Sequence, residues 1–226
     1  MSGAALLSGQ NVKHAEIHVP ASGLWHLDVA LADAPDLGTP TRQFTFGGLT
    51  LECAVLRSIN FAGERGLRLV AGKGGWRTVI PPRQYATSAN VSLSIVINDA
   101  ASAVGEPTPV IAGDQPLGNG YVRSQGPAVR VLDLLPFWYA DFTGTVQNAA
   151  RVATPITSTF TLMNVDRAAG KVEIATDNLA DWTPGRTFAT ANLSATIGRV
   201  MHVIRGSEVR TYAFTPNLVA GQAVAS

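Results

Sequence analysis

The sequence predicts a mainly β protein with a small helical insert and two small β-barrel-like domains. Apolar and polar residues alternate in the first and last thirds of the chain, which is the period of a half-buried strand. A helical spacing of apolar residues occurs only in the middle, and Gly and Pro separate the segments. We therefore expect an N-terminal β-barrel domain at 1–85, an insert of helix and loop at 86–148 and a C-terminal β-barrel domain at 149–226.

Short alternating strands dominate the first domain. The stretch 24–31 places one apolar set on a single face: Trp25, Leu27, Val29 and Leu31. The stretch 43–56 alternates on both sides of a Gly-Gly pair at 47–48, which predicts the turn between two strands. A further strand is expected at 67–70, followed by a glycine-rich turn at 72–75. Several short strands with turns between them are typical of a small barrel or sandwich.

Apolar residues recur every three or four positions after residue 90, which predicts a helix with one buried stripe: Leu93, Val96, Ile97, Ala100 and Val104. Ser88 is the expected cap of this helix, and Gly105 with Pro107 is expected to end it. The stretch 106–126 is rich in Gly and Pro and is predicted to be mostly loop.

A second short helix is predicted at the end of the insert. Pro127 suits its first position, and Pro136 stops it. Its expected buried residues are Val131, Leu132 and Leu135. An aromatic strand is predicted at 137–139, before a turn at 141–144.

The last third of the chain alternates again. Strands are expected at 157–162 and 171–175, and the clearest hairpin joins 200–204 to 209–214. A Gly-Ser pair at 206–207 suits the two-residue turn of this hairpin.

Composition excludes several classes of function. The chain has 17 Lys and Arg residues and 16 Asp and Glu residues, and the net charge of +1 does not suit a basic nucleic-acid binder. The single cysteine, Cys53, cannot form an internal disulfide or a cysteine-bound metal cluster. With no typical signal peptide and no apolar run of roughly 18 residues, we expect a soluble protein made in a cytoplasm. Only 15% of the residues are charged, and burial of the surface by other subunits would explain this.

No motif predicts a catalytic, cofactor-binding or metal-binding residue. His14, Glu16 and His18 share one strand face and offer donors for a divalent metal, but a solvated strand face explains the same pattern. His26 and His202 are isolated in the sequence and are expected at the surface or at the edge of a pocket.

Two further candidates for chemistry have structural explanations. The glycine-rich stretch at 72–75 contains Lys73 but lacks the spacing and the following helix of a phosphate-binding loop, so it is predicted to be a turn. Cys53 alternates with Leu51 and Val55 on an apolar strand face and is expected to be a buried side chain, not a nucleophile.

Aromatic and acidic residues leave two rival functions open. Trp25 and Trp138 lie in apolar strands, whereas Trp76 and Trp182 follow turns and offer freer faces on which a sugar could stack. Two carboxylates distant in the chain could form the acid pair of a glycosidase. The candidates lie near turns or helix ends, where aspartate is also structurally common: Asp133, Asp141, Asp166, Asp177 and Asp181.

Several short motifs follow one another along most of the chain. They are AEIHVP at 15–20, GLWHLDV at 23–29, FGGLTL at 46–51 and VAGKGGWR at 70–77, then, after the helix, GPAVRVL at 126–132, WYAD at 138–141 and PGRTF at 184–188. In this order they resemble the baseplate or tail-tip hub proteins of tailed bacteriophages. Each motif is short and most contain Gly, so their order carries the resemblance.

The resemblance implies two related β-barrel domains per chain and a ring of six barrels formed by three copies. Such a ring would match a sixfold tail tube on one side and a threefold spike on the other. The implied function is that of a structural virion protein, without enzymatic activity or cofactors, that joins the tail tube to the central spike and the surrounding baseplate subunits. Compared with larger hub proteins, we expect no extra domains, and the lone Cys53 cannot hold the cysteine-bound cluster of some of them.

The same resemblance implies partners and a location. The expected partners are the tail tube, the spike and other baseplate proteins, with the chain as a homotrimer and with no membrane or specific nucleic-acid partner. The expected location is the virion, in the phage tail or baseplate, after assembly in the host cytoplasm.

The stretch 106–126 is the expected contact with a partner, since it is too long for a passive connection. Its expected contact residues are Asp114, Gln115, Leu117 and Asn119. Arginine is favoured at interfaces, and three arginines are expected to add polar anchors at such contacts: Arg77, Arg83 and Arg123. Exposure of these charged side chains to solvent is the alternative explanation of their presence. The alternative functions are a glycan-binding module that uses Trp76 or Trp182 and a tail-associated cell-wall hydrolase.

Overall fold

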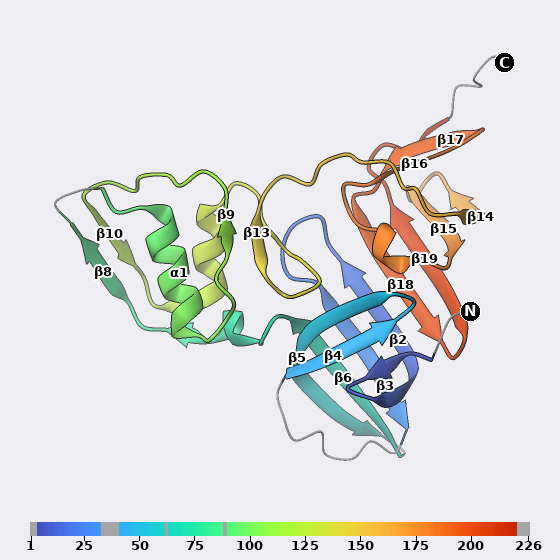
Figure 1. Cartoon of the computed structure of the whole chain (residues 1–226), viewed down its shortest axis with the longest axis horizontal. Helices are drawn as coiled ribbons and strands as arrows, with labels where there is room; N and C mark the ends of the chain where they lie inside the picture. The colour runs from blue at the N-terminus through green and yellow to red at the C-terminus, as the bar shows by residue number, and fades with distance from the viewer. Residues whose placement is uncertain (1–3, 33–40, 62, 88–89, 221–226) are drawn as a thin grey trace.

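The computed structural model describes residues 4–32, 41–61, 63–87 and 90–220. Figure 1 shows three regions: a β-barrel from the N-terminal part of the chain, an insert around one helix, and a second β region from the C-terminal part. The predicted fold class, mainly β with a small helical insert, is confirmed. The domain limits given above stay a prediction.

Six strands close the N-terminal barrel in the order β1-β4-β5-β6-β3-β2, and β1 pairs back onto β2. The apolar face predicted for 24–31 lies in the core, where Trp25, Leu27 and Leu31 are fully buried. Gly47 and Gly48 both have positive φ in the predicted turn between β4 and β5. The strands are β1 (Leu6–Leu7), β2 (Gln10–Val19), β3 (His26–Ala32), β4 (Thr41–Phe46), β5 (Leu49–Phe61) and β6 (Glu64–Ala71).

The C-terminal β region continues the sheet of the barrel. Strand β18 (Arg199–Arg205) pairs antiparallel with β2, and β19 (Glu208–Phe214), β15 (Lys171–Thr176) and β14 (Phe160–Asp166) follow in that order. The predicted hairpin with its Gly206–Ser207 turn is confirmed between β18 and β19. A separate three-stranded sheet consists of β16 (Thr187–Thr190), β17 (Leu193–Thr196) and β20 (Val219–Ala220).

One hydrophobic core extends through both β regions. Ile17 of β2 and Ile204 of β18 belong to it and are fully buried. Near the 3-10 helix η3 (Leu179–Asp181), the rings of Phe160 and Trp182 pack edge to face with centroids 5.1 Å apart, and Phe188 packs against Trp182 at 5.7 Å. The two β regions are therefore joined by apolar packing as well as by strand pairing.

The insert has its own hydrophobic core. Helix α1 (Leu93–Ala103) buries most of the predicted stripe, and the 3-10 helix η2 (Ala128–Leu134) packs beside it. A short 3-10 helix, η1 (Gly75–Arg77), precedes the predicted insert, and its Trp76 packs into the same core. Short strands surround these helices: β7 (Val79–Ile80), β8 (Arg83–Ala86), β9 (Val110–Ile111), β10 (Gly120–Arg123), β11 (Gly126–Pro127), β12 (Tyr139–Ala140) and β13 (Val146–Asn148).

Two local predictions for the insert were wrong. The cap of α1 is Ser92, whose hydroxyl accepts the N–H of Ile95 at 3.4 Å, and the predicted cap, Ser88, lies outside the described residues. The helix starts this late because Val91 still has extended pairing, with its N–H 2.7 Å from the Gly118 carbonyl oxygen. The predicted second short helix is confirmed as a 3-10 helix that starts directly after Pro127, ends before Pro136 and buries Val131 and Leu132.

The second error concerns the predicted aromatic strand at 137–139. Only its last residue, Tyr139, lies in a strand, because the chain bends at 135–137 before β12 begins. The bend leaves Phe137 60% exposed. The stretch 106–126 is mostly loop as predicted, although β9 and β10 lie within it.

The barrel and the insert meet at a glycine-rich joint. The carboxylate of Glu106 accepts the backbone N–H groups of Lys73 at 3.0 Å, Gly75 at 2.6 Å and Trp76 at 3.3 Å. A Cβ atom at Gly75 would lie 2.2 Å from the Val104 carbonyl oxygen, so glycine is required there. The turn predicted at 72–75 is confirmed, and its amide groups bind a carboxylate of the same chain.

A second joint fastens the returning end of the insert to the barrel. The indole N–H of Trp25 donates to the Asp141 carbonyl oxygen at 2.8 Å, and the Glu52 N–H donates to the Phe142 carbonyl oxygen at 2.9 Å. A Cβ atom at Gly144 would lie 2.3 Å from the Gly72 Cα atom. The two joints therefore lie against each other on the barrel.

Replacing Glu106 tests the first joint. In Glu106→Gln an NH₂ group replaces one oxygen of the carboxylate. A backbone N–H that donated to this oxygen then faces another donor and has no acceptor. Because Glu106 is buried, we expect the free energy of unfolding to fall by about 1 to 3 kcal/mol. Urea denaturation measures this change. Glu208→Gln, at an exposed position in the β18–β19 hairpin, is the control, and an equal effect of both changes would contradict the prediction.

His202 was predicted at the surface or a pocket edge, which is wrong, because it is fully buried in β18. Its Nδ1 atom lies 2.9 Å from the Thr211 hydroxyl oxygen. Burial lowers the pKa of His202 to about 4, so the buried imidazole is neutral at pH 7.

This burial makes the stability of the fold depend on pH. Between about pH 6.5 and about pH 4 the unfolded chain binds a proton at His202 that the folded chain does not, so stability falls as the pH is lowered. The full effect is about 3 kcal/mol. His202→Asn keeps a polar group near Thr211 and does not titrate, and we expect a flatter curve of unfolding free energy against pH in this window. Parallel curves for the variant and the original protein would refute the assignment.

Candidate functional site

The predicted contact residues of the loop lie beside the beginning of α1. The Asp114 carboxylate accepts the Ser94 N–H at 2.9 Å and the Ser94 hydroxyl at 2.6 Å, and these hydrogen bonds lower the pKa of Asp114. The Gln115 carbonyl oxygen accepts the Leu93 N–H at 2.9 Å. The loop therefore supplies acceptors for the first amide groups of the helix, which have no partner within it.

The rest of this loop is held by its backbone. The Leu117 N–H donates to the Val91 carbonyl oxygen at 2.7 Å, and the Asn119 carbonyl oxygen accepts the Thr87 N–H at 3.3 Å. The side chains of Gln115 and Asn119 are exposed. The loop is thus a fixed surface with outward polar groups, although a contact with another chain stays a prediction for all four residues.

The three predicted arginine anchors have different surroundings. Arg77 and Arg83 are exposed, whereas Arg123 is only 5% exposed. Arg123 donates to Asp99 Oδ2 at 2.8 Å and to the Tyr85 hydroxyl at 3.0 Å, and Arg83 pairs with the other oxygen of Asp99. The structure thus gives Arg123 an internal role in the insert, while partner contacts of the three arginines stay a prediction.

Contacts among Tyr85, Asp99 and the two arginines shift the pKa values of Tyr85 and Asp99. Burial and the hydrogen bond to Asp99 raise the pKa of the Tyr85 hydroxyl to about 12. Burial acts to raise the pKa of Asp99, but the Tyr85 hydroxyl and both arginines outweigh it, so this pKa is lowered. Asp99 is therefore ionised at pH 7 and neutralised by its own neighbours.

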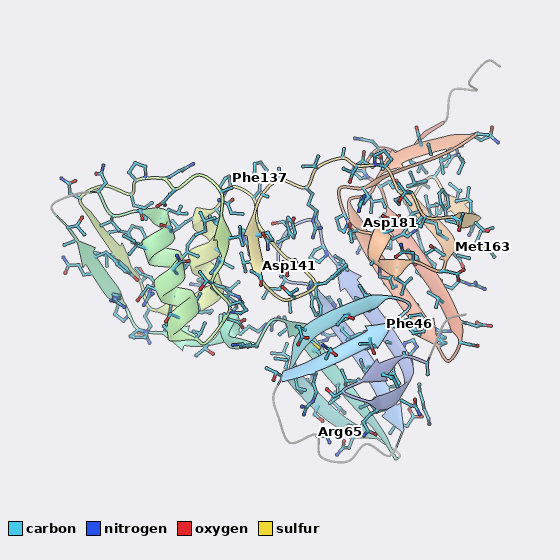
Figure 2. The ribbon with its side chains drawn as sticks, viewed as in Figure 1. Phe46, Arg65, Phe137, Asp141, Met163 and Asp181 are labelled. Carbon is cyan, nitrogen blue, oxygen red and sulfur yellow. The ribbon has the colours of Figure 1, made fainter. Side chains whose placement is uncertain are left out.

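A pocket of about 290 Å³ joins the predicted loop to Phe137. We call it the Phe137 pocket; it is lined by Leu93, Ala112, Gly113, Gln115, Leu135, Pro136, Phe137, Asn148, Ala149 and Ala150. Figure 2 labels Phe137 at the edge of the insert. Aromatic side chains are common anchors in protein interfaces, so Phe137 is a candidate contact residue of this pocket. Phe137 was not among the predicted contact residues, because the aromatic run 137–139 was assigned to a strand.

The indole rings proposed for sugar stacking are not accessible. Trp76 is 1% exposed in the core of the insert and Trp182 is 0% exposed in the core of the C-terminal region. The prediction that they are freer than the other tryptophans was wrong, because a position after a turn does not show which side chains pack over it. A glycan platform on these two residues is excluded in this structure.

Two of the candidate acids and Cys53 have structural roles. Asp141 Oδ1 accepts the N–H groups of Thr143 at 2.9 Å and Thr145 at 3.0 Å, and Figure 2 shows Asp141 at the returning end of the insert. Asp181 Oδ2 accepts the Ser158 N–H at 2.9 Å. Cys53 is buried as predicted, and burial raises the pKa of its thiol to about 12, which opposes formation of a thiolate.

The histidines of β2 share one outer face, as predicted. Glu16 lies between them, with 3.1 Å from Oε1 to His14 Nε2 and 3.6 Å from Oε2 to His18 Nε2. His26, which stands alone in the sequence and was predicted at the surface or a pocket edge, is half-buried on this outer face, and its ring stacks on that of His18 with centroids 4.5 Å apart. Burial, with a contribution from His18, lowers the pKa of His26.

Among the described residues, no helix is long and apolar enough to cross a membrane.

No protein-family model matches the sequence, and no curated protein matches it. Solved structures do match in fold. The chain aligns with the Escherichia coli c3393 protein, a type VI secretion system component described as structurally similar to the T4 bacteriophage tail proteins gp27 and gp5, with a TM-score of 0.64 and 12% identity over 99% of this chain and 80% of that chain.

Two tail proteins match over almost their whole chains. A tail protein from Neisseria meningitidis MC58 aligns with a TM-score of 0.60 and 10% identity, covering 98% of each chain. The 43 kDa tail protein of prophage MuSo2 from Shewanella oneidensis aligns with a TM-score of 0.65 and 8% identity, covering 97% of this chain and 98% of that chain. At these identities the likeness concerns the fold. The chain therefore has the fold of phage tail proteins and of a type VI secretion component, in agreement with the resemblance to tail-tip hub proteins.

Proposed function

We propose that this chain is a structural subunit of a phage tail, a baseplate or tail-tip hub component that joins the tail tube to the central spike and the surrounding baseplate proteins by symmetric contacts. One observation carries the proposal: three proteins of tail or tail-like assemblies share the fold over 97% or more of this chain. A match of this extent includes the barrel, the insert and the C-terminal β region together.

The geometry of the sheet suits a load-bearing subunit. The ten-stranded sheet crosses from one β region to the other without interruption. Within the described residues, β14 at its end pairs only with β15, and an edge strand of this kind offers backbone groups to a neighbouring chain. Met163 of β14 is 50% exposed, which adds an apolar side chain to this edge.

We infer a role without catalysis. The carboxylates of Asp141 and Asp181 are used by backbone amides, and Cys53 is buried with a raised thiol pKa. Burial of Trp76 and Trp182 argues against the alternative of a glycan-binding module. A tail-associated hydrolase is the remaining alternative, and clearing of a cell-wall preparation by the purified protein would support it.

The proposed partners are the tail tube, the spike and other baseplate subunits, in a virion assembled in the host cytoplasm. We propose that the chain forms a homotrimer in this assembly, because closed symmetric oligomers are the usual form of ring components. The Phe137 pocket and the loop beside it are the proposed partner-contact surface.

The solution mass tests self-assembly. The subunit is 23.7 kDa, so a homotrimer has a mass of about 71 kDa. We expect this species in sedimentation equilibrium or light scattering of the purified protein. A monomer at every concentration tested would contradict a trimer that forms without its partners.

Substitution of Phe137 tests the contact surface. Because Phe137 is 60% exposed, Phe137→Ser should change the free energy of unfolding by less than about 0.5 kcal/mol. The same change should weaken association at least about tenfold if the ring is a buried anchor in the complex. The readout is the amount of protein that copurifies with tail particles.

Val152→Ser is the matched control. Val152 is 74% exposed and does not line the Phe137 pocket. We expect normal incorporation of this variant. Equal incorporation of both variants would show that Phe137 is not part of an essential contact.

A further inference from the structure

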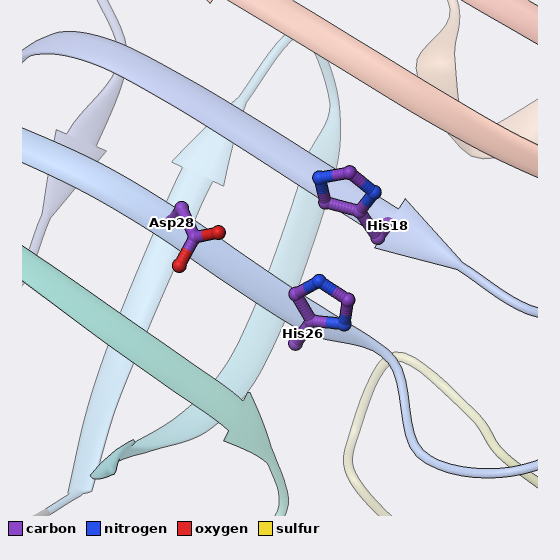
Figure 3. Close-up of side chains that lie close together, drawn as sticks. All are labelled: His18, His26 and Asp28. Atoms are coloured by element: carbon purple, nitrogen blue, oxygen red, sulfur yellow. The ribbon is translucent and has the colours of Figure 1, made fainter. Parts of the chain in front are cut away.

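The outer wall of the barrel carries a cluster of metal-ligating side chains that the tail proposal does not use. His18 of β2 lies directly opposite His26 of β3, and Glu16 lies opposite Asp28 in the next pair of the same face. Figure 3 shows the two imidazole rings stacked across the strands, with Asp28 beside them on β3. One ligand atom from each of His18, His26 and Asp28 lies within 4.8 Å of the others.

We propose that His18, His26 and Asp28 form a site for a divalent transition-metal ion, with Zn²⁺ as the best fit. Two imidazoles and one carboxylate are a common donor set of zinc sites that keep a fourth position for water or a further ligand. Imidazole also suits other first-row ions, whereas Mg²⁺ and Ca²⁺ prefer oxygen donors alone.

Binding of one ion requires the two rings to turn out of their stack, because the lone pair of each nitrogen lies in its ring plane and the two planes are nearly parallel, at 9°. Ligand atoms about 2.0 to 2.1 Å from a tetrahedral ion lie roughly 3.4 Å from each other. The present spread of 4.8 Å must therefore shrink by about 1.4 Å. All three side chains are only partly buried, so the rings and the carboxylate have room to turn. Their backbone positions are fixed by strand pairing in a closed barrel, as a built site requires.

Two neighbouring charged side chains, Arg68 and Glu16, act on such a site in opposite ways. The Asp28 carboxylate accepts two hydrogen bonds from Arg68, both 2.7 Å long, and this pairing lowers the pKa of Asp28. Glu16 reaches His18 Nε2 at 3.6 Å on the other side. Ligating histidines and carboxylates are commonly oriented by such second contacts. Arg68 also competes with a metal for Asp28, so it should limit the affinity.

Metal titration of the full chain tests the site. We expect isothermal titration with ZnCl₂ to show one ion per chain, and CoCl₂ to give the visible absorption of a tetrahedral complex. His18→Ala and His26→Ala should each weaken zinc binding at least about tenfold. No binding of either ion by the original protein would overturn the proposal.

His14→Ala is the matched control. His14 lies on the same face of β2 as His18, is similarly exposed and also contacts Glu16, but it is not one of the three clustered residues. We expect unchanged zinc affinity in this variant. A loss equal to that of His18→Ala would show that zinc binds exposed histidines without a defined site, and would refute the proposal.

Two variants test the carboxylate separately from the histidines. Asp28→Asn should weaken zinc binding, whereas Arg68→Gln removes the competing guanidinium and should strengthen it. An unchanged affinity in both variants would remove Asp28 from the site and overturn the three-residue assignment. Circular dichroism of every variant checks that the barrel is intact, and His18→Gln and His26→Gln replace any alanine variant that does not fold.

Discussion

Both β regions depend on strand β2, because it pairs with three other strands. β3 pairs along one edge of β2, whereas β1 and β18 pair with different parts of its other edge. The closed barrel and the open C-terminal sheet therefore share strand β2. Alternation along β2 sends Ala15, Ile17 and Val19 into the common core. A shift of one residue would exchange this set for the titratable face that contains His14 and Glu16, so the register is strongly specified.

The insert depends on polar contacts at two joints instead of on the common core. At the start of the insert, the buried carboxylate of Glu106 accepts hydrogen bonds from three backbone N–H groups of the turn after β6. At its return, an indole and a backbone amide of the barrel hold the Asp141 turn. This construction fixes the position of the insert and leaves its outer loops exposed, which is the usual arrangement for recognition surfaces on a rigid scaffold.

The titratable groups divide into those used by the fold and those left on its surface. Asp99, Asp141 and Asp181 are occupied by arginine, tyrosine or amide groups of the chain, and His202 is neutral in the core. The face of β2 and β3 differs, because packing of the barrel does not require stacked imidazoles on its outer wall. The proposed contact surface and the proposed metal site therefore lie on different elements.

Local periodicity was enough to predict most strands of the barrel, though not β1, together with the stripe of α1 and the last hairpin, because alternation directly reports which side of an element is buried. The order of the short motifs along the chain indicated the fold of phage tail proteins, which the matching solved structures share. Contacts between distant residues were decided only by the tertiary structure. Glu106 binds amides 31 residues away, His26 meets His18 through cross-strand register, and Trp182 is covered by rings from other strands. None of these contacts follows from local spacing. For the same reason, the exposure of Phe137 and the burial of Trp76 and His202 were not predicted.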